Sequence, residues 1–377
     1  MSYNSIISEN AQWIDSVWQK LDEKLSRTAL RSRNKIPYTT QNGVHDDRNT
    51  DKRITFWTNG FWGGLMWLMY AATGKEDYKI TAKKAEEIMD GAFGYVHRLH
   101  HDVGFMWHIM SGASYRLTGD LESKNRNLLA AQLLMGRYNV DGGYLVAWNT
   151  EERKGWTIID TMMNIPLLYW ASREIKDDRF AMVARHHADT ALRDHIRPDG
   201  SVVHIVSHNP AGPEVIETFG GQGYGVGSSW SRGTAWAVYG FALSYIHTGD
   251  EKYLDAAKKV AHYFIANAAG TQWLPLVDFR APSEPVCYDS TASVITACGL
   301  IEIAKHVPEN EQDLYLNAAI QLLKAAESAW CNWEENEDSI LQNGALRYGT
   351  DPEPIIYGDY YFTEAILKLK GSEFLPW

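Results

Sequence analysis

Aspartates stand just before several apolar segments of this 377-residue chain, at Asp102, Asp160, Asp289 and Asp359. An aspartate at the start of a helix commonly caps it, because its carboxylate accepts hydrogen bonds from backbone N–H groups that lack another partner. The surroundings of Asp289 and Asp359 favour this role. Asp102 instead follows two histidines, and Asp160 lies between isoleucine and methionine residues with no cation nearby in the sequence. We therefore consider Asp102 and Asp160 as candidates for chemistry.

Two facing carboxyl groups in apolar surroundings suit general acid catalysis. Burial and a neighbouring negative charge both raise the pKa of a carboxyl group. Such a group can hold a proton near neutral pH and donate it to a substrate. Asp102 and Asp160 precede consecutive apolar segments, so the sequence permits them to meet. An acid pair is thus one hypothesis, and helix capping is the other.

Other kinds of catalytic centre fit the sequence less well. His100 and His101 could bind a metal ion, but neighbouring residues rarely both reach one ion, and no cysteine or glutamate completes the site. We expect neither a metal nor a cofactor. The glycine-rich segment 220–230 follows no clear strand and lacks the Lys-Ser/Thr ending of a phosphate-binding loop, which favours a flexible active-site loop. No Gly-x-Ser-x-Gly sequence supports a serine hydrolase.

The segments that would position these residues repeat along the chain. Each unit has a segment that is apolar on all sides, typical of a buried helix, followed by one with a single apolar stripe. The inner segments are 60–72, 104–117, 160–174, 232–247, 289–305 and 358–369. The outer segments are 9–27, 76–97, 122–138, 178–196, 251–267 and 311–331. Helices that alternate in depth predict an all-α fold, an (α/α)6 barrel or toroid, with 1–377 as a single catalytic domain; an irregular helical protein is the alternative.

Aromatic residues gather at the starts of the inner segments. The chain has 15 Trp and 20 Tyr, and the stretches 57–62, 105–107, 230–236 and 357–361 are rich in aromatic residues. Many of these rings will simply fill the core. Because the starts of the inner helices all lie at one end of such a ring, the others would line a bowl suited to a sugar.

Composition limits the partners and the compartment. A net charge of −11 argues against binding to nucleic acid or to an anionic membrane. The chain has no run of about 18 apolar residues, so we predict no membrane span. The N-terminal sequence has neither a basic start nor an apolar signal core, and Cys287, Cys298 and Cys331 fit a reducing compartment. We therefore expect a cytoplasmic protein.

Six stretches of the chain, taken in order, carry a resemblance to a known family. They are WTNGFWGGLMWL (57–68), HHDVGF (100–105), IIDTMMNIPLLYWA (158–171), SSWSRGTAWAVYGFAL (228–243), DSTASVITACGLIEIA (289–304) and YGDYYFTEAILKL (357–369). These stretches resemble the unsaturated glucuronyl hydrolases, glycoside hydrolase family 88, and HHDVGF and SSWSRGTAW are the more specific of them. The helical segments alone would also suit the related unsaturated rhamnogalacturonyl hydrolases, which lack the HHD run.

The resemblance implies an (α/α)6 barrel and an enzyme that uses no metal. It also implies a reaction on the unsaturated oligosaccharides that polysaccharide lyases leave. The enzyme would hydrate the C4=C5 double bond of a terminal unsaturated glucuronic acid and so release that residue from the adjoining sugar. A conventional inverting glycosidase and a non-catalytic carbohydrate-binding protein on the same barrel are the alternatives.

The resemblance further implies a set of site residues. Asp160 would act as acid and then as base, and Asp102 would steady the sugar and keep the proton on Asp160. The residues expected around a small unsaturated oligosaccharide are Trp57, His101, Trp148, His204, Gln222, Arg232 and Trp236. Two stretches depart from the family pattern. Gly221 stands where the family has a histidine, and 343–361 lacks the Ser-x-Ser-x-Lys sequence associated with sulfated substrates.

Overall fold

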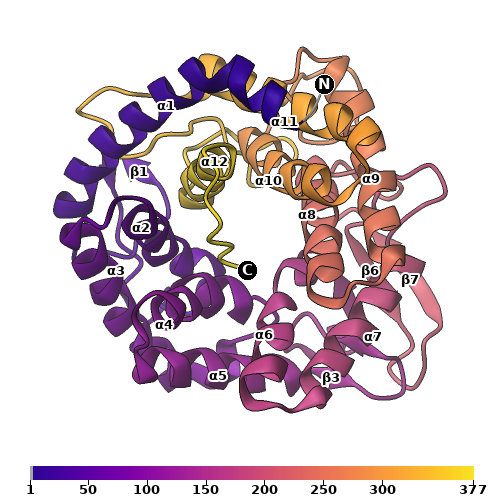
Figure 1. Ribbon diagram of the computed structural model, residues 1–377. Coiled ribbons are helices and arrows are strands. Elements are labelled where there is room, and N and C mark those ends of the chain that lie inside the picture. Colours follow the sequence, from indigo (N-terminus) through magenta and orange to yellow (C-terminus); the bar gives the residue numbers. More distant parts are fainter. Residues whose placement is uncertain (1–2) are drawn as a thin grey trace.

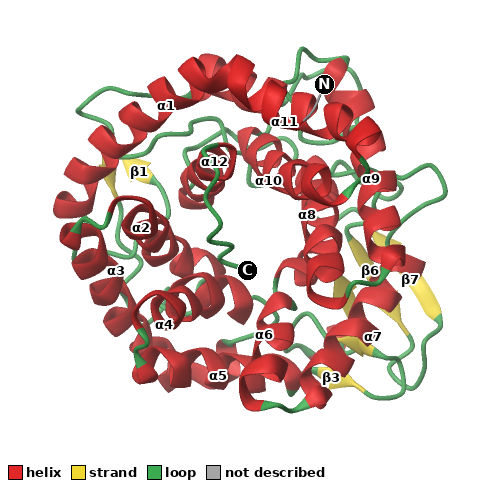
Figure 2. Cartoon of the chain, in the orientation of Figure 1, coloured by secondary structure: helices red, strands yellow, loops and turns green. Residues whose placement is uncertain are grey.

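The computed structural model describes residues 3–377, and its helices form a closed ring of two layers (Figures 1 and 2). The outer layer consists of α1 (Tyr3–Arg31), α3 (Glu76–Met89), α5 (Leu121–Met135), α7 (Asp178–Asp194), α9 (Glu251–Ala269) and α11 (Glu309–Trp330). The inner layer consists of α2 (Gly60–Thr73), α4 (Ala113–Thr118), α6 (Pro166–Ile175), α8 (Ser231–Thr248), α10 (Ser290–His306) and α12 (Ile356–Leu369). Helix α1 packs against α3, α11 and α12, so the first helix closes the ring with the last ones. The predicted helices are all present, and the prediction of an (α/α)6 toroid is confirmed.

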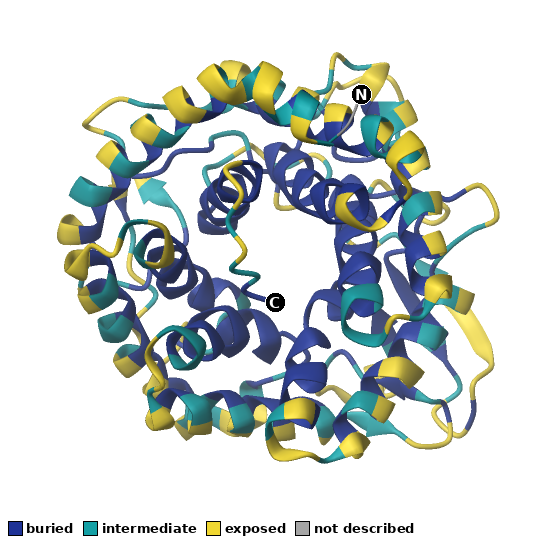
Figure 3. Ribbon diagram, in the orientation of Figure 1, coloured by how far each residue is buried: buried dark blue, intermediate teal, exposed yellow. Residues whose placement is uncertain are grey.

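The two layers differ in burial as the sequence pattern predicts. In α10 every residue from Ser290 to Ala304 is buried, because an inner helix is covered on all sides. An outer helix buries one face, as in α9, where Tyr253, Ala257 and Val260 are buried at spacings of four and three residues. Figure 3 shows the inner helices in dark blue and the exposed faces of the outer helices in yellow. Although the inner helices are apolar, no helix within residues 3–377 is long and apolar enough to cross a membrane.

Two inner helices start irregularly, beside Asp102 and Asp160. Segment 104–117 begins as a π-helix, η3 (Gly104–Gly112), and continues as α4. Segment 160–174 begins as a 3-10 helix, η5 (Ile159–Met163), and α6 starts only at Pro166, which has no N–H to donate inside a helix. The outer segment 76–97 also divides, into α3 and the 3-10 helix η2 (Asp90–Arg98).

Short strands occupy the connections between helices. Strand β1 (Thr40–Gln41) pairs with β2 (Val44–His45), and β3 (Tyr138–Asn139) pairs with β4 (Tyr144–Leu145). An antiparallel sheet has the order β5 (Trp156–Ile158), β6 (Ile205–His208) and β7 (Val215–Phe219). Strand β5 leads into η5 and β6 begins directly after His204, so this sheet positions both Asp160 and His204.

The final residues enter the middle of the ring (Figure 1). Trp377 is buried, its ring stacks on Tyr361 with 5.8 Å between centroids, and its Nε1 donates to Glu364 Oε2 at 3.1 Å. Arg116 of α4 holds the approach by donating to the carbonyl oxygen of Leu375 at 2.7 Å. Side chains from this tail therefore occupy the axis of the ring.

Candidate active site

Asp102 and Asp160 lie close together at the starts of two inner helices, and Asn164 links them. The Asn164 amide nitrogen donates to Asp102 Oδ1 at 3.4 Å and to the backbone oxygen of Asp160 at 3.3 Å. Its amide oxygen accepts from the N–H of Phe105 at 2.8 Å. Gly104 permits this approach, since a Cβ there would lie 2.7 Å from Asn164. The fold therefore brings the two candidate acids to one place.

The surroundings of the acid pair favour a proton on it. Burial raises the pKa of Asp102 well above its ordinary value, and the charge of Asp160 raises it further. His100 Nδ1 and His101 Nε2 lie 3.3 and 3.4 Å from Asp102 Oδ2. Burial lowers the pKa of His100 to about 4 and that of His101 well below its ordinary value, so both rings are neutral near pH 7. Neutral imidazoles do not offset the repulsion between two carboxylates, so Asp102 retains a proton more readily than an isolated aspartate.

The Asp160 carboxyl group does not cap its helix. Helix η5 follows Ile158, which holds the N-cap position, and Asp160 lies inside the first turn. Asp160 Oδ1 has no hydrogen-bond partner within residues 3–377, and His204 Nε2 lies 3.5 Å from it. The Asp160 side chain keeps 12% of its surface exposed. It is thus accessible and uncommitted, as a proton donor must be.

Two backbone groups face Nδ1 of His204. The N–H of Gln222 lies 3.0 Å from Nδ1 and the carbonyl oxygen of Gly220 lies 3.2 Å from it, while Nε2 is the nitrogen near Asp160. The His204 ring packs on Trp230 with 4.2 Å between centroids. Gly221 makes this contact possible, because it has a φ of +61° and a Cβ there would lie 2.1 Å from His204 Nδ1. No larger residue fits at position 221 with the loop in this place.

The glycine-rich segment 220–230 is fastened at several points. Asp278 is buried and accepts from the N–H groups of Tyr224 and Ser229, each at 3.0 Å. The Gln222 side chain donates to the carbonyl oxygen of Leu346 at 2.6 Å, and its backbone oxygen accepts from Tyr348. The amide predicted to contact the uronate therefore joins two loops.

Arg232 interacts with other groups in the interior of the protein. Its guanidinium is buried, pairs with Asp289 Oδ2 at 2.7 Å, and donates to the backbone oxygens of Ala345 and Leu346. It also lies 4.5 Å from the centroid of the Trp230 ring. The structure thus gives Arg232 partners within the protein, and its contact with a substrate carboxylate stays a prediction.

The two aspartates predicted as caps have different roles. Asp289 caps α10 as predicted, accepting from the N–H of Thr291 at 3.1 Å. The prediction for Asp359 is wrong, because Ile355 holds the N-cap position of α12 and Asp359 lies inside the helix. Its carboxylate accepts from the N–H groups of Ile340 and Leu341 at 3.0 and 2.7 Å, and so fastens the preceding loop to α12.

The three tryptophans predicted to contact the sugar differ in how far their side chains are exposed. Trp57 is half-buried, with ring centroids 5.4 Å from Phe105 and 5.1 Å from Tyr357. Trp148 is also half-buried and stands edge-on to His101 at 5.9 Å. Trp236 is fully buried in α8. Trp57 and Trp148 can present a face to a sugar, whereas Trp236 packs beneath the site.

The donor atoms of His100, His101 and Asp102 lie within 4.8 Å of one another. The sequence argument held that neighbouring residues rarely both reach one ion, and in this turn the two histidines do come close to one point. Both imidazoles lie beside the same oxygen of Asp102, but His100 Nδ1 has no hydrogen-bond partner within residues 3–377. That the enzyme needs no metal stays a prediction.

Sequence patterns missed Arg137 and Asn164. Arg137 donates from Nε to the carbonyl oxygen of Val146 at 2.6 Å. Its charge offsets a part of the rise in the pKa of Asp102 and adds to the effect of burial in lowering the pKa values of His100 and His101. It is thus a cation beside the acid pair. Asn164 follows Asp160 by four residues, a spacing that a search along one helix face could have found.

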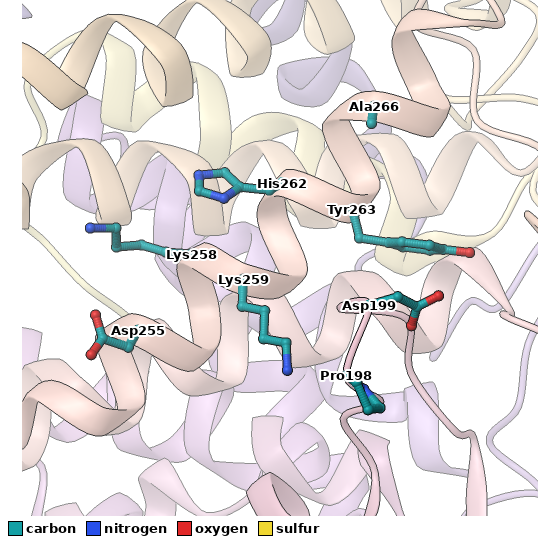
Figure 4. Close-up of a pocket in the computed structure, with 8 residues that line it drawn as sticks. All are labelled: Pro198, Asp199, Asp255, Lys258, Lys259, His262, Tyr263 and Ala266. Carbon is teal, nitrogen blue, oxygen red and sulfur yellow. The ribbon is translucent and has the colours of Figure 1, made fainter.

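A surface hollow elsewhere on the ring is separate from the acid pair. Figure 4 shows its lining side chains on α9 and on the turn after α7, among them Lys258, His262 and Asp199. Lys258 pairs with Glu311 at 2.6 Å, and Asp199 pairs with Arg280. None of the nine predicted site residues, which all lie in the described part of the chain, lines this hollow.

The chain is similar to enzymes of known activity along most of its length. It is 35% identical over 327 residues, 84% of this chain and 86% of the relative, to the unsaturated glucuronyl hydrolase of Bacillus sp. (strain GL1). It is 32% identical to an unsaturated chondroitin disaccharide hydrolase of Streptococcus pneumoniae, over 86% of this chain and 84% of the relative. No family model matches the chain.

Solved structures agree with these relatives. The crystal structure of the Bacillus sp. GL1 enzyme superposes with a TM-score of 0.86 at 31% identity, covering 95% of this chain and 97% of that one. The structure of an unsaturated glucuronyl hydrolase specific for heparin superposes with a TM-score of 0.87 at 27% identity, covering 96% and 97%. The similarity therefore extends over the whole ring.

Proposed function

This chain belongs to the unsaturated glucuronyl hydrolase family, and from that premise we propose how its residues divide the reaction. The protein is a hydrolase of unsaturated uronyl oligosaccharides and releases the terminal unsaturated glucuronic acid. Relatives named for unsaturated chondroitin disaccharides support a glycosaminoglycan fragment as the substrate.

The reaction adds water across a double bond. The electron pair of C4=C5 takes a proton at C4, and positive charge develops at C5, where the ring oxygen shares it. Water then bonds to C5 and returns a proton to the enzyme. The resulting hemiketal opens to a ketone, and the hemiacetal left at C1 releases the adjoining sugar. One acid that gives a proton and then accepts one is sufficient for this sequence.

Asp160 gives the proton to C4 and accepts the proton of water. The observation that supports this most directly is its uncommitted carboxyl group, partly exposed beside a second, more buried acid. Asp102, held by Asn164, keeps a proton on the pair through repulsion. When Asp160 becomes ionised, the Nε2–H of His204 stabilises the carboxylate at a distance of 3.5 Å.

The remaining predicted residues shape the place for the sugar. Trp57 and Trp148 bind sugar faces, because both retain exposed surface, and Trp148 lies against His101 beside Asp102. His101 supports Asp102 and Trp148. Gln222 fixes His204 through its backbone, and Arg232 and Trp236 hold the frame from below.

We extend the proposal to organisation and compartment. The chain acts as one catalytic domain, since the acid pair depends on helices η3 and η5, and His204 on a loop tied to the segment before α12. A cytoplasmic location is supported by Cys287, Cys298 and Cys331, which form no disulfide in the structure of residues 3–377.

The test follows the ultraviolet absorbance of the C4=C5 double bond. Unsaturated disaccharides from chondroitin, hyaluronan and pectin are incubated with the wild type, Asp160→Asn and the control Asp141→Asn, an exposed aspartate in the β3–β4 turn. We expect turnover of a glycosaminoglycan disaccharide by the wild type and the control, and a loss of about 10²–10⁴-fold in Asp160→Asn. A wild type that leaves every uronate unchanged, or cleaves saturated sugars instead, would contradict the proposal.

A further inference from the structure

Three half-buried rings form a small aromatic shelf, which consists of Trp148, Trp156 and Phe219. The Trp156 ring stacks on Phe219 with 4.5 Å between centroids, and Trp148 stands edge-on to Trp156 at 6.0 Å. The shelf packs on Ala147, Ile158 and Ile205, a cluster separate from the main core. Two of its rings lie on strands β5 and β7, so the sheet supports it (Figure 2).

The aromatic shelf begins at the acid pair. Trp148 contacts His101 at 5.9 Å between centroids, and His101 Nε2 lies 3.4 Å from Asp102 Oδ2. From there the shelf leads away from the acids along the sheet. A sugar attached to the uronate therefore meets these rings if its chain extends in this direction.

Arg153 lies over the aromatic shelf without a carboxylate partner. It ends the 3-10 helix η4 (Glu151–Arg153), and its Cζ lies 5.1 Å from the Trp148 centroid and 5.3 Å from the Trp156 centroid. The neighbouring cation, Lys154, pairs with Glu151. No carboxylate within residues 3–377 lies within ion-pair distance of Arg153. The stacked rings thus hold an exposed guanidinium whose donors remain available.

A free guanidinium beside a sugar site is suited to one kind of ligand. Its planar fork matches the oxygens of a sulfate ester or a carboxylate and binds them with two parallel hydrogen bonds. The whole chain has a net charge of −11, so a local cation is needed to hold an anionic substrate there. The uronate carboxylate lies on the sugar that the acid pair attacks. Arg153 is connected to Asp102 through Trp148 and His101, and we therefore assign its ligand to a later sugar.

We propose that Arg153 and the aromatic shelf bind an anionic substituent, a sulfate ester or a carboxylate, on the leaving side of the substrate. The rings pack against the face of the sugar, and the guanidinium binds the charged substituent of that sugar. The proposal rests on the proposed function, and it makes Arg153 a specificity residue that takes no part in proton transfer.

The test compares Arg153→Gln with wild type and with Lys154→Gln, which removes a neighbouring but paired charge. The substrates are unsaturated chondroitin disaccharides with and without a sulfate on the second sugar, and an unsaturated tetrasaccharide whose later sugars carry a carboxylate only. For Arg153→Gln we expect kcat/KM to fall by about tenfold on at least one of the two anionic substrates and to change less than about twofold on the unsulfated disaccharide. Added salt should reproduce part of this loss in the wild type, and Lys154→Gln should match the wild type on all three substrates.

Binding without turnover separates this proposal from the proposed function. Calorimetry with the saturated sulfated disaccharide should show weaker binding to Arg153→Gln than to wild type, whether or not the enzyme consumes unsaturated sugars. Equal kcat/KM ratios for Arg153→Gln and wild type on all three substrates would overturn the role of Arg153. An equal loss on all three would also overturn it, because the effect would then be on the site in general.

Discussion

Four aspartates near the starts of inner helices fall into two pairs with opposite duties. On one side of the ring, Asp289 and Asp359 belong to regular α-helices, and backbone N–H groups or Arg232 occupy their oxygens. On the other side, Asp102 and Asp160 stand where η3 and η5 begin irregularly, and Asp160 Oδ1 has no partner among residues 3–377. The number of donors within reach, rather than residue type or place in the sequence, decides which aspartate stabilises the fold and which does chemistry.

The irregular helices explain why donors are scarce at the acid pair. A helix that starts in a regular way offers its first N–H groups to a capping carboxylate. In η3 and η5 the hydrogen-bond pattern changes near the start, and such changes are common at functional sites. A buried, poorly bonded carboxyl group costs stability, which a protein retains only where function needs it.

The largest expected effect separates catalysis from folding at Asp160. Asp160→Asn should lower kcat/KM by about 10²–10⁴-fold, because an amide cannot donate and then accept the proton. Its midpoint in urea should stay close to wild type, since Asp160 Oδ1 makes no hydrogen bond that folding requires. Parallel activity assays and urea titrations check this. A large loss of stability would place Asp160 with the structural aspartates.

The opposite outcome is expected at Asp289. Asp289→Asn leaves the buried guanidinium of Arg232 without its counter-charge, which should cost about 3–5 kcal/mol in the free energy of unfolding. Urea titration against the exposed control Asp141→Asn measures the difference. A cost below about 1 kcal/mol would show that the backbone oxygens of Ala345 and Leu346 are sufficient partners.

A smaller loss of stability is expected at Asp359. The N–H groups of Ile340 and Leu341 both donate to Oδ1, and Oδ2 accepts from the Ser339 hydroxyl at 2.9 Å and again from the N–H of Ile340 at 3.0 Å. Asp359→Asn keeps one oxygen and places an NH2 group where the other oxygen accepted these donors. An unsatisfied buried donor costs about 1–3 kcal/mol. Hydrogen exchange of these two amides should quicken together with the loss in urea stability. Unchanged protection would mean that the loop does not depend on this carboxylate.

The smallest effect has the opposite sign and depends on pH. The pKa of Asp102 is higher in the folded protein than in the unfolded chain. The stability that Asp102 contributes is therefore fully present at a pH below its unfolded-state pKa, and it is lost as the pH rises through its folded-state pKa. Asp102→Asn removes this loss and should be more stable than wild type at pH 8, by about 1 kcal/mol. The gain should shrink as pH falls toward 4. Urea titrations at several pH values check the sign, and a variant less stable than wild type at pH 8 contradicts it.

Sequence patterns predicted what depends on neighbours along the chain. The alternation of apolar and striped segments located every helix of the ring, and Asp289 was recognised as a cap because its acceptor role involves Thr291, two residues away. Asp359 was misassigned because its donors, Ile340 and Leu341, come from another loop. The ion pair of Arg232 with Asp289 and its hydrogen bond to Ala345 were beyond the pattern for the same reason, since these partners lie far along the chain.

The irregular start of each catalytic helix was also beyond the pattern. The periodicity of apolar residues shows which face of a helix is apolar. A π-turn keeps that face apolar while it shifts the side chains that follow, so the periodicity does not reveal the turn. Asn164, which ties the two acids together, is one polar residue in an apolar segment, and its meaning depends on Asp102, which precedes it by 62 residues.

Trp377 has a consequence for how a polymer could be degraded. Its ring, stacked on Tyr361 and bonded to Glu364, obstructs the hole of the toroid. A glycan therefore cannot thread through the ring and be cut repeatedly as it slides.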